Sequence, residues 1–160
     1  MAMNTDRDSI GSAIGRIPSG CSILTAARGD RATGVLCSWV QQAYFDPPAV
    51  SIALKRGRPV TEWLGNGEPF LLNIIGSDPT ALFKHFGKGF ALEEDAFAGL
   101  AFEPSPYGPQ IVDSLGHLGC RVLSRLPVGD HDLYVGEVLA GVVNSADRPY
   151  VHLRKSGFSY

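Results

Sequence analysis

Apolar and alternating stretches divide most of the chain into strand-like segments. Residues 21–27 and 32–40 are apolar and flank the turn Arg-Gly-Asp-Arg, which predicts a β-hairpin. Residues 49–55 alternate, with large apolar side chains from Val50 to Leu54 on one face and small residues ending in Lys55 on the other. Three more strands are predicted, an apolar one at 69–76 and two long ones within 117–144 that are joined near Pro-Val-Gly-Asp. Residues 150–155 predict a last strand.

Short helices are predicted at only a few places. Asp8 or Ser9 is expected to cap a first helix, because apolar residues follow at helical spacing. Residues 59–64 begin with proline and predict one or two helical turns. A further helix is predicted over residues 78–87, with Asp78 as its cap and a glycine at its end.

Residues 88–111 are rich in Gly and Pro and show no clear period. We expect a long excursion there, with at most a short helix around residues 92–98. Six or seven strands with only short helices predict a mainly β chain, an antiparallel barrel that is closed or nearly closed. No repeat or linker divides the sequence, so residues 1–160 are expected to form one domain whose residues 1–8 are flexible.

The charge balance argues against a nucleic-acid-binding surface. The 160 residues contain 14 Lys and Arg and 16 Asp and Glu, a net charge of −2, whereas binding to phosphates needs a basic excess. The three cysteines form no CxxC pair, which indicates a reducing compartment. No apolar run approaches the roughly 20 residues that span a bilayer. We therefore expect a cytoplasmic protein with neither a nucleic-acid nor a membrane partner.

A basic turn directly after the alternating strand is the first candidate site. Lys55, Arg56 and Arg58 surround Gly57, just before the helix predicted at residues 59–64. Such a turn suits an anion, because glycine lets the backbone approach closely and a helix N-terminus attracts negative charge. The alternative is an ordinary solvated turn, which the local pattern alone favours.

Two glutamines and a histidine are further candidates. Gln41 and Gln42 are neighbours in a strand, so at most one is expected to face a ligand, where its amide would donate to a phosphate or a heterocycle. Spacing alone favours the alternative, that both are exposed at a strand end. His131 follows a Gly-Asp turn and lies between two aspartates. A role in catalysis and a place on a polar hairpin fit its local sequence equally well.

Other catalytic and cofactor motifs are absent from the sequence. The histidines show no HxxxH or HxH spacing, so no metal site is predicted. There is no GxSxG nucleophile elbow, and Cys37 lies in an apolar strand, where a thiol is usually inert. With neither GxGxxG nor a P-loop, any nucleotide has to be held in another way.

Several blocks, taken in order, resemble the flavin reductase-like family, which has the FMN-binding split-barrel fold. They read GRIPSGCSILTA, TGVLCSWVQQAYFDPPAVSIALKRGRP, FLLNI, GDHDLYVGEV and YVHLRKSGFSY, and they extend from about Ile14 to Tyr160. Their wording is most similar to the reductase module at the C-terminus of cyanobacterial diflavin flavoproteins. No flavodiiron portion precedes the blocks, so we expect a free-standing relative.

The resemblance implies a homodimer that binds FMN, or FAD, near the subunit interface and reduces it by hydride transfer from NADH or NADPH. The segment at 36–42 would run along the isoalloxazine, the turn at 55–58 would hold the phosphate with help from the glutamines, and Trp39 would shield the flavin or pack in the core. The implied cofactor-binding residues are Leu36, Cys37, Ser38, Trp39, Val40, Gln41, Gln42, Lys55, Arg56, Gly57 and Arg58. His131 is the implied catalytic residue, beside the flavin and nicotinamide pocket.

The product of such a site would be reduced flavin, or electrons, for a monooxygenase or another acceptor. Many family members have Asn-Ser and Thr-Ser where this chain has Ser38-Trp39 and Gln41-Gln42, a departure that leaves the hydrogen-bond donors and the choice between FMN and FAD open. Two alternatives remain. One is an FMN-binding protein without reductase turnover, serving storage or electron relay, and the other is a structural partner domain that has lost its flavin.

Overall fold

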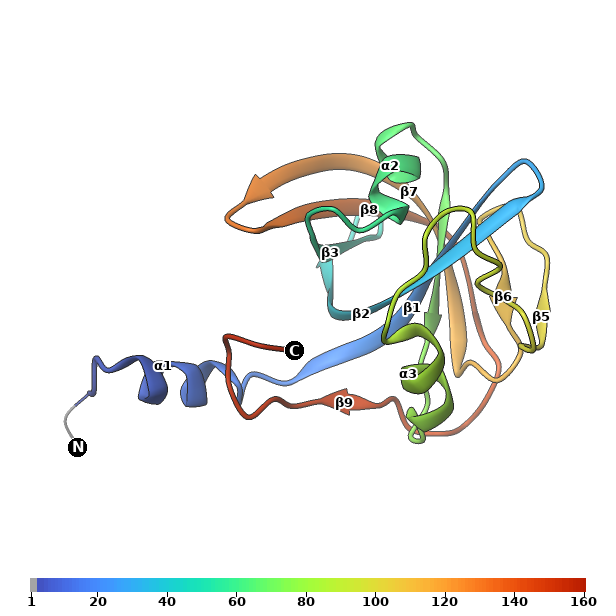
Figure 1. The fold of residues 1–160 in the computed structure, drawn as a ribbon. Coiled ribbons are helices and arrows are strands. Elements are labelled where there is room, and N and C mark those ends of the chain that lie inside the picture. The colour runs from blue at the N-terminus through green and yellow to red at the C-terminus, as the bar shows by residue number, and fades with distance from the viewer. Residues whose placement is uncertain (1–2) are drawn as a thin grey trace.

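Six antiparallel strands close into a barrel in the computed structural model, which describes residues 3–160 (Figure 1). They are β1 (Ser19–Arg28), β2 (Arg31–Tyr44), β3 (Ala49–Lys55), β4 (Phe70–Ile74), β7 (Gly116–Val128) and β8 (His131–Val143). The strands follow the order β2-β3-β8-β7-β4-β1, and pairing of β1 with β2 closes the sheet on itself. The predicted mainly β, antiparallel barrel is therefore confirmed.

The remaining elements are short and lie around the barrel. Three helices are present among residues 3–160, namely α1 (Arg7–Ile14), α2 (Val60–Gly65) and α3 (Thr80–Phe86). Strands β5 (Phe102–Glu103) and β6 (Gln110–Ile111) pair only with each other, while β9 (Val151–His152) pairs with β1. Helix α1 lies away from the barrel, next to the returning C-terminal residues (Figure 1). None of the helices in this part of the chain has the length and apolar character needed to cross a bilayer.

Local sequence signals account for the well-predicted elements. Strand β3 has the predicted bounds, and its large alternate side chains Val50, Ile52 and Leu54 are buried in the barrel. The cap of α1 differs from the prediction, because Asp6 accepts the backbone N–H of Ser9 at 2.9 Å in place of Asp8 or Ser9 acting as the cap. The helix consequently begins within the segment expected to be flexible. Residues 1–2 lie outside the described part.

Residues 92–98, where at most a short helix was expected, form turns. Side chains compete there for backbone donors, since Glu94 accepts the N–H of Ala91 at 2.6 Å and Asp95 accepts the N–H of Phe97 at 3.0 Å. The last strand was also predicted too long, because only Val151 and His152 pair with β1.

Two apolar clusters form the core. One fills the barrel, and the other lies between β1, α3 and residues 88–111. Buried Asn73 on β4 joins this excursion to the barrel: its amide donates to Ile23 O and accepts the N–H of Ile111 at 2.8 Å. The excursion thus forms a fixed wall next to α3.

Candidate functional site

A split between β2 and β3 creates the candidate site. The two strands pair from Tyr44–Ala49, next to the connecting loop, as far as Val40–Ile52. No pairs between β2 and β3 are present beyond Val40–Ile52 in the described residues. Residues 36–39 of β2 and 53–55 of β3 therefore face each other across a gap with backbone N–H and C=O groups that this pairing does not use. Strand β3 remains anchored on its other side, where residues 53–55 pair with β8.

A β-bulge lies at the same place on the opposite edge of β2. The β1–β2 register jumps from Gly20–Val40 to Ser22–Cys37, which leaves one extra residue on β2. As a result the neighbours Cys37 and Ser38 are both buried, contrary to simple alternation. Bulges of this kind re-aim side chains next to functional sites.

The gap opens into a cavity of about 360 Å³, which we call the groove. Strands β2 and β3 form one wall, α3 forms another, and the basic turn closes one end. The lining residues are Cys21, Val35, Leu36, Cys37, Ser38, Ala53, Leu54, Lys55, Arg58, Phe83, Phe86, Gly87, His152 and Tyr160. Most of this surface is apolar, so the groove suits a flat, largely apolar ligand with a charged end.

The basic turn contributes two cations to the groove. Lys55 and Arg58 line it, and neither forms an ion pair within residues 3–160. Gly57 between them has φ of 81°, a conformation that favours glycine. Thr61 fixes the turn by donating its hydroxyl to Arg58 O at 2.6 Å. A Cβ atom on Gly89 would lie 3.2 Å from Arg58 Nη1, so the excursion passes close to this guanidinium.

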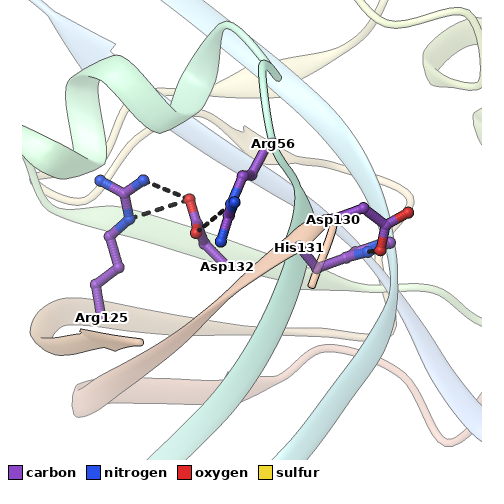
Figure 2. A network of polar contacts seen from close by, with 5 residues as sticks. All are labelled: Arg56, Arg125, Asp130, His131 and Asp132. Atoms are coloured by element: carbon purple, nitrogen blue, oxygen red, sulfur yellow. Dashed lines mark hydrogen bonds and ion pairs between the residues drawn. The ribbon is translucent and has the colours of Figure 1, made fainter. Parts of the chain in front are cut away.

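Arg56, the third cation, points elsewhere. Its Nε lies 3.1 Å from Asp132 Oδ1, and Arg125 donates to the other carboxylate oxygen. Figure 2 shows the two arginines converging on this carboxylate, while Asp130 and His131 form a separate pair. Burial alone would raise the pKa of Asp132, but the hydrogen bonds from Arg125 and Arg56 outweigh it and hold the pKa below its usual value. Arg56 therefore fastens the turn to β8.

His131, the predicted catalytic residue, begins β8 directly opposite Lys55. Its ring is buried, and Nδ1 lies 2.7 Å from Asp130 Oδ1 while Nε2 is hydrogen bonded to the Tyr160 hydroxyl. The Trp39 ring centroid lies 4.6 Å from that of His131. Trp39 and His131 line a second cavity, of about 510 Å³, next to the groove.

The glutamines lie outside the groove. Gln41 and Gln42 pair with Ser51 and Val50, on the side of Val40 where β2 and β3 still form a regular ladder. Together with Val40 they line a separate cavity of about 300 Å³. The register thus keeps them from the groove, and their part in holding a phosphate stays a prediction.

The thiols next to the groove are protonated. Burial raises the pKa of Cys37 to about 12 and that of Cys21 to about 11, so both act as small apolar side chains. Within residues 3–160 no three His, Cys, Asp or Glu side chains come together as a metal site would require.

Several functional residues escaped the sequence reasoning. Asp132 and Arg125 form their pair across the β7–β8 hairpin, and Tyr160 reaches the site from the end of the chain. The second aspartate of the Gly-Asp-His-Asp motif was a usable signal for Asp132. Tyr160 had none, because its contact with His131 depends on the path of the C-terminal residues.

The family model for the flavin reductase like domain matches residues 14–159. The chain belongs to the flavin reductase-like family. Two relatives of the domain are "Putative diflavin flavoprotein A 3" of Nostoc sp., 37% identical, and "Diflavin flavoprotein A 1" of Synechocystis sp., 38% identical, each over 151 residues and 92% of this chain. The match covers 26% of each relative, so the chain spans about a quarter of their length. The predicted resemblance is thereby confirmed.

Solved structures share the fold of this flavin reductase-like domain. The NADH:FAD oxidoreductase SgcE6 of Streptomyces globisporus superposes with a TM-score of 0.84 at 19% identity, over 96% of this chain and 92% of that one. A homologue of nitrilotriacetate monooxygenase component B from Mycobacterium thermoresistibile gives 0.77 at 25% identity, over 89% and 79% of the two chains. Flavin reductase HpaC, solved with NADP+, gives 0.75 at 24% identity, over 90% and 91%. The split barrel is thus the common architecture.

Proposed function

We propose that this domain is an NAD(P)H:flavin oxidoreductase that binds FMN, or FAD, in the groove and reduces it by hydride transfer from NADH or NADPH. The observation that carries the proposal is the split of β2 from β3. It leaves residues 36–39 without a strand partner on the side of β3, beside an apolar groove that is also lined by Lys55 and Arg58. A flat heterocycle with an anionic tail matches both parts.

The residues present fit a flavin. The groove volume of about 360 Å³ falls in the range of small-molecule sites. Backbone N–H and C=O groups of β2 can bond the polar edge of an isoalloxazine, because such groups donate and accept in alternation. Lys55 and Arg58, which have no ion-pair partner among residues 3–160, supply charge-assisted contacts for a phosphate.

The chain's own residues position and shield rather than exchange protons. A bound flavin supplies the redox chemistry by accepting the hydride of a reduced nicotinamide. Asp130 orients the His131 ring, Trp39 packs beside it, and the two rings line the cavity next to the groove. Arg58, Lys55 and the backbone N–H groups of β2 favour negative charge in the groove, as the reduced state of a flavin requires.

Relatives and neighbours support the proposal through their names. The relatives are diflavin flavoproteins, and the neighbours include SgcE6 solved with NAD and FAD fragments and HpaC solved with NADP+. We further propose that the reduced flavin, or its electrons, pass to a monooxygenase or another acceptor. The three cysteines are all free and buried, which favours the reducing cytoplasm as the place of action.

We also propose a homodimer. The β7–β8 hairpin exposes apolar side chains along its length, at Leu123, Leu126 and Val128 near the turn and at Leu139, Val142 and Val143 toward the other end. Exposed apolar surface of this kind often marks a protein interface. Burying this hairpin against a second copy would remove these side chains from solvent.

The visible spectrum of the purified protein, followed by NADH and NADPH oxidation with excess FMN and then FAD, tests the function. Turnover with either flavin supports the oxidoreductase. A yellow protein without turnover overturns it and leaves the alternative of flavin storage or electron relay. A colourless protein that binds neither flavin would instead favour a structural domain that has lost its cofactor.

A further inference from the structure

The second cavity adjoins the groove and is defined by the two ends of the chain. We call it the outer cavity; it measures about 510 Å³ and shares Lys55 and Tyr160 with the groove. It is lined by Arg7, Trp39, Lys55, Asp130, His131, Arg154, Gly157, Phe158, Ser159 and Tyr160. A ligand with a ring at the groove can therefore extend into it without leaving the protein surface.

Helix α1 and residues 153–160 form the outer wall of this cavity as a built unit. The N–H of Arg154 donates to Gly15 O at 3.1 Å, and the N–H of Gly157 donates to Gly11 O. Glycines permit this approach, because a Cβ atom on Gly157 would lie 2.4 Å from the side chain of Ile14. Arg154 is thus fixed on this wall through its own backbone N–H.

Positive charge dominates the outer cavity. Arg7, Lys55 and Arg154 line it, and none of them forms an ion pair within residues 3–160. Asp130 is the lining carboxylate, and its Oδ1 is hydrogen bonded to His131. Three cationic side chains thus line the cavity against one carboxylate side chain, so the cavity favours an anionic ligand.

Both arginines are pre-positioned by aromatic rings. The Arg154 guanidinium lies 5.0 Å from the centroid of the Trp39 ring, and the Arg7 guanidinium lies 3.9 Å from that of Phe158. Arg154 Nη1 also donates to Ser159 O at 3.4 Å. A ring below a guanidinium occupies its face, so the remaining edge N–H groups can still bond phosphate oxygens. A single carboxylate can accept both N–H groups of one guanidinium, whereas two guanidinium groups can bind the two phosphates of a diphosphate.

We propose that the outer cavity binds the diphosphate of the nicotinamide dinucleotide, with Arg7 and Arg154 as its main ligands. The inference rests on the proposed function, because the nicotinamide ring has to reach the groove. It assigns a binding role to α1 and to residues 153–160, which lie outside the barrel.

Calorimetric titration of the FMN-loaded protein with ADP-ribose tests the site directly, because ADP-ribose carries the diphosphate without the nicotinamide. Arg7→Met and Arg154→Met keep the apolar packing and remove the charge. Each is expected to weaken ADP-ribose binding about tenfold or more, the effect of losing a charge-assisted contact, and to raise KM for NADH while FMN affinity stays the same. Arg16→Met, an exposed arginine outside the cavity, is the matched control and should behave as the parent protein.

The outcomes separate the two proposals. Absence of ADP-ribose binding by the parent protein, or unchanged binding in both variants, overturns the diphosphate site. Loss of FMN affinity in the variants also overturns it, since the arginines would then belong to the groove. Absence of NADH and NADPH oxidation with bound FMN overturns the proposed reductase instead, whatever ADP-ribose does.

Discussion

His131 and Tyr160 are hydrogen bonded through Nε2 and the phenol hydroxyl, although they begin and end the final 30-residue stretch of the chain. A carboxylate only accepts, so Nδ1 donates to Asp130 Oδ1, and in a neutral ring Nε2 would accept the Tyr160 hydroxyl. Trp39 packs against both rings, with centroids 4.6 and 5.5 Å away. This cluster stands at the boundary between the groove and the outer cavity, where the proposed nicotinamide and flavin would meet.

Removing the His131 ring should therefore slow hydride transfer while flavin stays bound. We expect His131→Ala to reduce the rate about tenfold or more, because loss of positioning at a reacting centre is costly. Stopped-flow reduction of the FMN complex by NADH measures the rate, and fluorescence titration measures FMN affinity. Tyr160→Phe is the companion variant, since it keeps the ring and removes only the donated hydrogen bond. An unchanged rate in His131→Ala would take this histidine out of the mechanism.

Arg58→Ala should weaken FMN binding and leave the fold intact. Arg58 lines the groove without a carboxylate partner among residues 3–160, so a phosphate there gains a contact of about 1.5–3 kcal/mol, or roughly ten- to a hundredfold in Kd. Fluorescence titration with FMN provides the measurement. Arg28→Ala, on an exposed arginine that pairs with Glu68, controls for loss of charge. Equal affinity in both variants would move the phosphate elsewhere.

The Asp132 carboxylate should matter both for stability and for the basic turn. Asp132→Asn removes the charge that Arg56 and Arg125 share, and the thermal midpoint should fall by several degrees. Flavin affinity should fall as well, because Arg56 no longer fastens the turn to β8. Glu137→Gln, which breaks the partly exposed pair with Arg121 on the same hairpin, should have a smaller effect on both. If the two variants lost equal stability, the buried Asp132 pair would contribute no more to stability than the partly exposed pair.

The same carboxylate predicts an acid dependence. The pKa of Asp132 is lowered in the folded protein, so its contribution is complete above the ordinary aspartate pKa of about 4 and is lost as the pH falls below that value. Urea unfolding at pH 7 and pH 3 should therefore show a smaller drop in stability for Asp132→Asn than for the parent protein. Parallel losses in the two proteins would contradict this assignment.

The cysteines should resist alkylation in the native state. Burial raises the pKa of Cys37 and Cys120 to about 12 and that of Cys21 to about 11, which leaves almost no thiolate at pH 8. Mass spectrometry after iodoacetamide treatment should find the native protein unmodified and the urea-unfolded protein labelled three times. Rapid labelling of native Cys37 would mean that the groove is open to solvent in a way that the structure does not have.

The proposed dimer makes a prediction at the β7–β8 hairpin. Leu126→Glu places a charge among the exposed apolar side chains and should shift the protein toward the monomer in light scattering coupled to gel filtration. Val112→Glu, at a similarly exposed position outside the hairpin, is the control. A monomeric parent protein would refute the dimer, and a dimeric Leu126→Glu variant would place the interface elsewhere.

Local patterns predicted the barrel strands well and gave little detail for the excursion at residues 88–111. The bounds of β3 follow from alternation alone, because its large side chains are buried in the barrel while Ala53 and Lys55 line the groove. Residues 92–98, for which at most a short helix was expected, form turns, since Glu94 and Asp95 accept nearby backbone N–H groups. Short polar side chains of this kind leave the balance between turn and helix to tertiary packing.

Sequence reasoning predicted the parts of the candidate site that lie close together in the sequence, and it missed the parts that the fold brings together. Leu36, Cys37, Ser38, Lys55 and Arg58 were predicted from the neighbouring blocks, and they do line one groove. Whether Gln41 reaches it depends on where β2 leaves β3, which is a property of the whole barrel. The same holds for Arg154 and Tyr160, whose positions depend on the return of the chain past α1.

The split of β2 from β3 also bears on how such a domain changes over evolutionary time. Every residue type except proline presents the same N–H and C=O groups, so a ligand bound by the backbone of residues 36–39 would place little demand on the side chains there. Selection would then act on the bulge and the register, and composition could drift. This domain and SgcE6 have the same fold, with a TM-score of 0.84, at only 19% sequence identity. Such drift would produce a pair of this kind.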